Sequence, residues 1–515
     1  MRDDIRRFFS NPILVKHARS RLRPQSAFSA LAVVIMLNLC LAFAGYQLDW
    51  YQHGYVAGGI MAMQIVILGI MGSAQVNAAV NGARASGVLD FHRVTPMSPR
   101  ELMFGFFLGA PIREYALFAS TIPFTIFCMA FGIPTFRGIV QLMLLVLISA
   151  WILHAISMIS ALISNSKNPS GNALGMIVFL LFFFAYIVLG ATQSVYAVES
   201  EYRLRFFGIP LPWLPVILLY EVPMLFFLLL AATRKIESQR LHSLSKPQAI
   251  AAMLTFAMLT LGGIWRQENY QYFQIASLYL LVVPALLLGT MIVPSQAEYI
   301  KGLHRAQKQG QPRLPWWNDL SVSVPGLMIL PAIVLVAGTV VDTIATGTPD
   351  PQFGAPGSSN AYSLALAAAV LTVAYHAFGL QYYHLRFGRR APVYFSLFLF
   401  VAWLLPILGG WILAASETGQ NSERMAAPIF ALSPVAGIGM IYAIQREFAF
   451  PVQAAALTSI LLFAFGFAHL LVGARRRIIM GFVASLAERP ASVIGPDLDG
   501  VAKPISIALP GEAVP

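Results

Sequence analysis

The stretch "GIVQLMLLVLISAWILHAISMISALI" (138–163) decides the fold class of this chain. It holds no Asp, Glu, Lys or Arg, and a helix needs about 20 such apolar residues to cross a bilayer core about 30 Å thick. Similar runs recur along all 515 residues, and only 11% of the residues are charged, against about 25% in soluble proteins. A β-barrel is disfavoured because its strands alternate apolar and polar residues. The sequence therefore predicts an all-α polytopic membrane protein.

About twelve segments are expected to span the membrane, as two six-helix repeats. The first half holds 27–46, 55–80, 108–131, 138–163, 171–194 and 213–232. The second half holds 247–265, 271–292, 321–342, 361–384, 391–414 and 452–473. Residues 1–24 precede the first span and mix apolar with basic side chains, which predicts an amphipathic helix in the membrane interface.

The distribution of Lys and Arg predicts the orientation. A net charge of +12 could indicate nucleic acid, but the basic residues cluster in short segments between apolar runs, as the positive-inside rule requires. No nucleic-acid partner is therefore expected. With the N-terminus inside, about 27 of the 34 Lys and Arg residues fall on cytoplasmic segments. Both termini are then cytoplasmic.

Residues 425–450 are apolar enough to suggest a further span. A span there would move Arg475, Arg476 and Arg477 to the outer side, against the same rule. This stretch is therefore expected to form a re-entrant or surface helical segment on the outer side, within an outer segment at 415–450.

Two short stretches hint at an internal repeat. "LLLAATRKI" (228–236) closes the first half and "LLVGARRRI" (470–478) closes the second. We predict one transmembrane half over 1–235, with a coupling segment at 81–107, and another over 236–515. The second half contains a cytoplasmic segment at 293–320 and a cytoplasmic tail at 474–515. Paired repeats of this kind are common in transporters.

The stretch "GVLDFHRVTPMS" (87–98) is charged and turn-prone between two apolar spans. Gly87 can end one helix, and residues 88–94 can form a short one with Val88, Leu89 and Phe91 as apolar anchors. Pro96 disfavours helix at Thr95 and so ends it.

A new helix is expected directly after this stretch. Ser98 and Glu101 have the spacing of a capping box, and Pro99 stands at the first helical position. Together the two patterns predict a short cytoplasmic helix held between capped neighbours. Such an element could transmit the motion of a docked partner to the third span.

The second half has "PSQAEYIKGLHRAQKQGQPRLPWW" (294–317) at the corresponding topological place. Ser295 can cap a helix with Glu298 three residues on. Lys301, Arg305 and Lys308 would form a basic face. A role as a second coupling element rests on position alone, and an ordinary loop anchored at the interface is the alternative.

The 87–98 stretch resembles the cytoplasmic segment of type-2 ABC exporter permeases, which reads Gly-Thr-Leu-Glu and, some residues later, Thr-Pro-Leu-Ser. The positions identical to that pattern are Gly87, Leu89, Thr95, Pro96 and Ser98, and those similar in type are Val88, Asp90 and Met97. "NPILVKHARSRLR" (11–23) also resembles the amphipathic N-terminal helix of that family. His92 and Arg93 depart from it, because apolar residues are usual at those two positions.

The resemblance implies the permease subunit of an ATP-driven exporter in the cytoplasmic (inner) membrane of a prokaryote. The chain has no Gly-x4-Gly-Lys-Ser/Thr phosphate loop, so ATP and Mg would bind to a partner ABC ATPase, in two copies. No catalytic residue, metal or cofactor is expected on this chain. Besides the ATPase, its expected partner is membrane lipid. Either one chain supplies both halves, or two copies pair as a homodimer. The residues expected to couple to the ATPase are Gly87, Leu89, Asp90, Phe91, Thr95, Pro96 and Ser98 in the first half, and Glu298, Lys301 and Arg305 in the second.

Ionisable residues inside spans are the candidates for a substrate path, because a charge at mid-bilayer costs about 2.5–3.5 kcal/mol on insertion scales. They are Glu221, His154 and His376. The alternative is structural, with Glu221 hydrogen-bonded to a neighbouring helix and each His packed in its neutral form. As proton-coupling groups they would instead make the chain an ion- or proton-coupled secondary transporter. A non-transporting membrane scaffold is a third interpretation, and no pattern identifies a substrate.

Overall fold

The computed structural model of this chain describes residues 11–48, 55–131, 136–163, 203–238, 242–265, 271–311, 314–346, 359–416, 420–443 and 449–487. The chain divides into two compact units, Met1–Leu244 and Ser245–Pro515. The half boundary predicted after residue 235 falls inside the last helix of the first unit. Each unit is treated by itself below.

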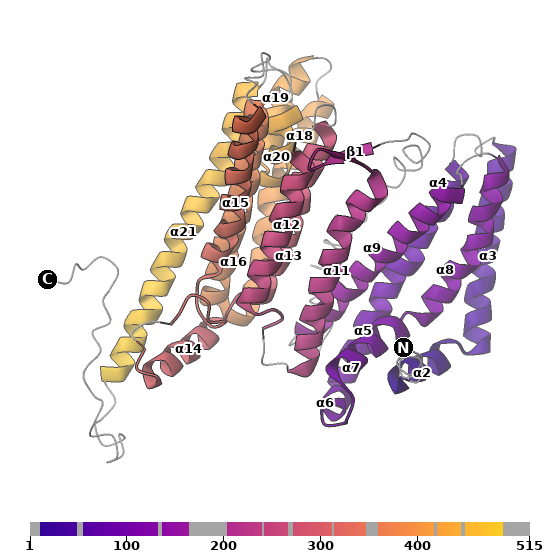
Figure 1. Cartoon of the computed structure of the whole chain (residues 1–515), viewed down its shortest axis with the longest axis horizontal. Coiled ribbons are helices and arrows are strands. Elements are labelled where there is room, and N and C mark those ends of the chain that lie inside the picture. Colours follow the sequence, from indigo (N-terminus) through magenta and orange to yellow (C-terminus); the bar gives the residue numbers. More distant parts are fainter. Residues whose placement is uncertain are drawn as a thin grey trace. The chain divides into compact units, whose positions relative to one another are not determined.

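Unit 1 (Met1–Leu244) begins with a short helix, α2 (Pro12–Arg21), followed by α3 (Pro24–Gln47) (Figure 1). A continuous helical rod then contains α4 (Tyr55–Gln64), the π-helix η1 (Ile65–Met71) and α5 (Gly72–Ala85). The remaining elements are α6 (Val88–Arg93), α7 (Pro99–Gly109), α8 (Ile112–Cys128), the 3₁₀ turn η2 (Met129–Phe131), α9 (Phe136–Ile163), β1 (Arg203–Phe206), β2 (Ile209–Pro212) and α11 (Trp213–Glu237).

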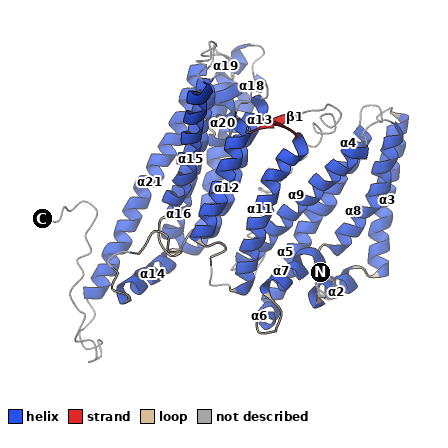
Figure 2. Cartoon of the chain, in the orientation of Figure 1, coloured by secondary structure: helices blue, strands red, loops and turns tan. Residues whose placement is uncertain are grey.

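Among its described residues, the secondary-structure elements of unit 2 (Ser245–Pro515) are all helices (Figure 2). Its first elements are α12 (Lys246–Ile264), α13 (Gln271–Ile292), α14 (Gln296–Lys308), α15 (Val324–Thr346), α16 (Ser359–Phe387) and the 3₁₀ turn η3 (Gly388–Arg390). They are followed by α17 (Ala391–Leu399), the π-helix η4 (Phe400–Leu404), α18 (Leu405–Ser416), α19 (Gln420–Ala431), α20 (Pro434–Ala443) and α21 (Ala449–Ala487).

The helices confirm a multi-pass α-helical membrane protein. Within the described residues, eight helices are long and apolar enough to cross a membrane, and ten if each of two bent pairs forms one span. A shorter apolar stretch, Val324–Val340 in α15, lies where the span 321–342 was predicted. The predicted span 171–194 lies outside the described residues. The total of twelve and the two repeats therefore stay predictions.

The third predicted span, 108–131, has different limits in the structure. It is a bent pair, α7 and α8, whose axes differ by 48°. The bend lies at Ala110–Pro111, where Pro111 has no backbone N–H to continue the helical hydrogen bonds. The apolar stretch therefore begins at Pro99, before the predicted start.

The apolar stretch at 425–450 forms two short helices. α19 and α20 have 12 and 10 residues and are separated by Leu432 and Ser433. Each rises about 15–18 Å, which is too short to cross a core of about 30 Å. Both pack against α21. That they lie on the outer side stays a prediction.

A β-hairpin precedes α11. This hairpin was not predicted, because only helices were expected from the sequence. Arg203 pairs with Pro212 and Phe206 with Ile209, in an antiparallel register. Phe207 and Gly208 form the two-residue turn with φ angles of 49° and 75°. Positive φ at both central positions is the type I′ geometry, which matches the twist of paired strands.

Helix α2 packs closely on α7 because two glycines leave room for it. A Cβ placed on Gly105 would lie 2.8 Å from Ile13 Cβ and 2.9 Å from Asn11 Oδ1. A Cβ on Gly109 would lie 3.0 Å from Leu14 Cα. Glycines four residues apart occupy one helix face and let two backbones approach closely.

We expect Gly105→Ala to destabilise the protein by about 1–3 kcal/mol, because the added methyl group overpacks the contact between α2 and α7. Thermal unfolding in detergent and protease cleavage at α2 would measure the effect. Gly82→Ala is the matched control, since no atom lies within 4 Å of a Cβ at Gly82. Equal stability of the two variants would contradict the expectation.

Candidate functional site

The segment between α5 and α7 is fixed at both of its ends. Gly87 has a φ of 73° and reverses the chain after α5, and the six residues of α6 follow. Ser98 then caps α7, because its side chain accepts from the Glu101 amide while Glu101 accepts from the Ser98 amide at 2.8 Å. The capping box and the turn at Gly87 confirm the local structure expected from the sequence.

The side chains of α6 divide between the core and the surface. Leu89 is 1% exposed and holds α6 against unit 1. Phe91 and Val94 are 65% and 82% exposed, so the prediction that Phe91 anchors the helix is wrong. A six-residue helix presents its sides to different environments, and here only Leu89 is buried. Because α6 is not one of the candidate membrane-spanning helices, these two exposed apolar side chains are candidates for contact with a partner.

Arg93 fastens α6 to the end of α11. Its Nε donates to the Ile236 carbonyl at 2.7 Å, and its Nη2 donates to the Lys235 carbonyl at 3.2 Å. Its third nitrogen forms an ion pair with Asp90 at 2.5 Å. The last carbonyls of a helix lack intrahelical partners and carry the negative end of its dipole, so a guanidinium stabilises them. The sequence departs from the family pattern at Arg93, and the structure gives this residue a specific set of partners.

A second arginine links the same region to α9. Arg84, in the last turn of α5, donates a hydrogen bond to the carbonyl of Ala161 near the end of α9. The two helices α9 and α11 pack against each other. Arg84 and Arg93 therefore join the α5–α6 region to the same ends of both helices (Figure 1).

Helix α14 lies in the segment of unit 2 that the sequence predicts as a second coupling element. It is inclined by 62° to the preceding Ala276–Ile292 helix and begins with a capping box between Ser295 and Glu298. Lys301 and Arg305 are exposed, whereas Tyr299 is 3% exposed. The predicted amphipathic helix with a basic face is therefore present.

A buried lysine that the sequence analysis overlooked supports the loop after α14. Lys246 is 1% exposed, and its ammonium donates to the carbonyls of Asn318 at 2.5 Å and Ser321 at 2.6 Å. It also donates to the hydroxyls of Ser321 at 2.5 Å and Ser323 at 3.1 Å. A lysine directly after the capping serine of an apolar helix was the only available signal, and it did not distinguish this position from an ordinary interfacial lysine.

Glu221 lies in α11 and accepts a hydrogen bond from the Ser149 hydroxyl of α9 at 2.6 Å. Its second carboxyl oxygen is buried and has no hydrogen-bond partner among the described residues. This geometry agrees with the structural alternative, a carboxyl bonded to a neighbouring helix. This second oxygen can therefore bind a proton or accept a hydrogen bond from a polar group of a substrate.

His154 is fully buried between α9, η1 and α8. Its Nε2 lies 2.8 Å from the Leu68 carbonyl in η1 and therefore carries the proton. Its Nδ1 lies 3.5 Å from the Tyr115 hydroxyl, which accepts from Trp151 Nε1 at 3.0 Å. Both ring nitrogens face fixed partners, as expected for a neutral packed histidine.

His376, in α16 of unit 2, is 4% exposed and packs edge-on against Phe395 with ring centroids 4.8 Å apart. Neither ring nitrogen has a hydrogen-bond partner among the described residues. In unit 1, His154 is hydrogen-bonded to the Leu68 carbonyl and Glu221 to the Ser149 hydroxyl, so the two residues share no partner in these hydrogen bonds. His154 and Glu221 therefore belong to separate polar contacts within unit 1.

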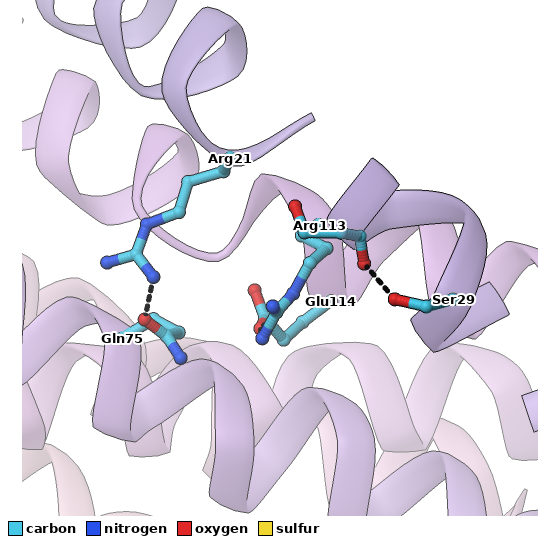
Figure 3. Close-up of polar contacts among 6 residues, drawn as sticks. Arg21, Ser29, Gln75, Arg113 and Glu114 are labelled. Carbon is cyan, nitrogen blue, oxygen red and sulfur yellow. Dashed lines mark hydrogen bonds and ion pairs between the residues drawn. The ribbon is translucent and has the colours of Figure 1, made fainter. Parts of the chain in front are cut away.

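Glu114, in the first turn of α8, is more buried than the carboxylate of an ordinary ion pair at the membrane interface. Glu114 is fully buried and accepts from Arg113 at 2.8 Å. Figure 3 shows the two side chains next to each other. Nearby, Arg21 of α2 donates to the Gln75 side chain of α5. The Arg21–Gln75 hydrogen bond joins α2 to α5, whereas the Arg113–Glu114 pair lies within α8.

Comparisons of the chain with protein-family models, with curated proteins and with solved structures found no match.

Proposed function

We propose that this chain is the permease subunit of an ATP-driven exporter of the type-2 ABC class, in the inner membrane of a prokaryote. A separate ATPase chain, in two copies, would hold ATP and Mg. The observation that carries the proposal is the α6 segment: it lies between the turn at Gly87 and the capped start of α7, exposes Phe91 and Val94, and is hydrogen-bonded through Arg93 to a long apolar helix. The resemblance of residues 87–98 to the family's coupling segment is its second support.

The proposed mechanism needs only rigid elements and their contacts. ATP-driven closure of the partner moves α6, and Arg93 passes that motion to α11 while Arg84 passes it to α9. The α9–α11 pair carries the Ser149–Glu221 contact, so its displacement would alter the polar part of the bundle. An alternating-access transporter requires that a helix pair such as α9 and α11 adopt two different arrangements.

The experiment begins with purification of the tagged chain from its native cell in mild detergent. We expect a stoichiometric ATPase to co-purify and to hydrolyse ATP. In Phe91→Ser/Val94→Ser we expect the apparent affinity for it to fall about tenfold or more, because burial of each apolar side chain contributes roughly 1.5–3 kcal/mol. Quantitative mass spectrometry and ATP hydrolysis by the purified complex measure both effects.

Phe91→Leu/Val94→Ile is the matched control, because it keeps the apolar surface. It should retain the ATPase. A chain that purifies alone and still transports in vesicles would contradict the proposal.

The unpartnered oxygen of Glu221 favours a second candidate, an ion- or proton-coupled secondary transporter. In that case Glu221→Gln abolishes transport, and transport needs no ATPase. The same vesicle assay, with and without ATP, separates the two functions.

A further inference from the structure

The surface of α2 that faces away from the protein has a basic groove. The groove has a volume of about 550 Å³ and is lined by Pro12, Val15, Lys16, Arg19, Ser20 and Arg23. The three cationic side chains are exposed, and among the described residues no carboxylate lines the groove. Lys16, Arg19 and Arg23 follow one another at intervals of three and four residues, which places them along one side of the helix and of the turn that follows it.

The other polar residues of α2 are turned toward the protein. Arg21 donates to Gln75 of α5, as Figure 3 shows. His17 packs against Phe106 of α7 with ring centroids 5.8 Å apart. Burial, with Arg21 and Lys16 nearby, lowers the pKa of His17 to about 4, so its imidazole is neutral at physiological pH. The positive charge available to a ligand therefore belongs to Lys16, Arg19 and Arg23.

The groove lies at the start of a helix that is itself exposed along its length. α3 begins at Pro24, one residue after Arg23. Only 11% of the 18-residue apolar stretch of α3 is buried within the protein. Phe28, Val33 and Met36 are exposed on it. A ligand with an anionic group in the groove and apolar chains along α3 would match both surfaces.

We propose that Lys16, Arg19 and Arg23 form a headgroup site for an anionic phospholipid, whose acyl chains lie along the exposed face of α3. The phosphate would accept from the lysine and the two arginines, and Val15 and Pro12 would contact the glycerol region. A soluble phosphate would use only the groove, and an acidic protein would not need the apolar face of α3. The site does not depend on the proposed transport function, because it concerns α2 and α3 alone.

The experiment titrates phosphatidylglycerol into the delipidated full chain in mixed micelles and follows thermal stabilisation. Phosphatidylcholine and inorganic phosphate are titrated in parallel. We expect stabilisation by phosphatidylglycerol, and an apparent Kd about tenfold or more higher in Lys16→Gln/Arg19→Gln/Arg23→Gln, since each cation near an anionic surface contributes about 1 kcal/mol.

The matched control is Lys301→Gln/Arg305→Gln/Lys308→Gln on α14, which removes the same charge from another exposed helix. It should change the Kd by less than about twofold. If the triple groove variant does not fold, Arg19→Gln alone should still raise the Kd about fivefold.

Four results would overturn the proposal. They are equal effects of the two triple variants, equal stabilisation by phosphatidylcholine, equal stabilisation by inorganic phosphate, and loss of a dimer in the groove variant with unchanged phosphatidylglycerol affinity. The third would identify an anion site without a lipid, and the fourth would identify a contact with a second copy of the chain.

Discussion

Lys246→Met should destabilise the protein by about 3 kcal/mol, the largest effect that we expect from a single substitution outside the apolar core. The ammonium is buried and serves four oxygens of the 318–323 loop. Methionine fills a similar volume but leaves the Asn318 and Ser321 carbonyls without this donor. A buried acceptor that loses its partner costs about 1–3 kcal/mol.

Unfolding of the purified chain in mixed detergent micelles, followed by circular dichroism, measures the change in unfolding free energy. Lys301→Met is the control, because Lys301 is exposed on α14 and its loss should alter stability by less than about 0.5 kcal/mol. The structural role of Lys246 would be refuted if the two variants unfolded alike.

Arg93→Gln should uncouple the ATPase from transport, provided that the proposed function is correct. The substitution removes the ion pair with Asp90 and the fork that reaches the Ile236 and Lys235 carbonyls. Hydrogen bonds from a charged group contribute about 1.5–3 kcal/mol each. We therefore expect transport to fall about tenfold or more while ATP hydrolysis by the complex changes by less than about twofold.

Hydrogen exchange gives a readout that does not depend on transport. Amide exchange in α6 should accelerate in Arg93→Gln, because the helix loses its attachment to α11. Arg93→Lys should restore little, since an ammonium lacks the planar fork that spans two carbonyls. Arg100→Gln is the control, because Arg100 is exposed in the first turn of α7. Loss of the ATPase from the Arg93→Gln complex would instead make Arg93 part of the docking surface.

Local structure around Gly87–Glu101 and Ser295–Glu298 was predictable because it depends on neighbours in sequence. Ser98 with Glu101, and Ser295 with Glu298, form the expected capping boxes. Gly87 takes the left-handed conformation that ends α5. Each of these features needs only residues three or four positions apart, so the sequence contains all the information that they require.

Contacts between distant segments were not predictable in the same way. Arg93 and Ile236 are 143 residues apart, and Lys246 and Ser321 are 75 apart. A basic residue near an apolar run looks the same whether it faces the interface or a helix end. The burial of Lys246 and the exposure of Phe91 both reverse the usual preference of those residue types.

The sequence by itself determined that the chain is a multi-pass helical membrane protein, because long uncharged apolar runs have one stable solution in a bilayer, in which each helix satisfies its own backbone hydrogen bonds. It also determined where the capped helices begin, since caps are local. Only the tertiary structure decided which residues join those helices to the bundle. Leu89, Arg93 and Lys246 owe their roles to carbonyls and side chains that folding brings close from distant parts of each unit.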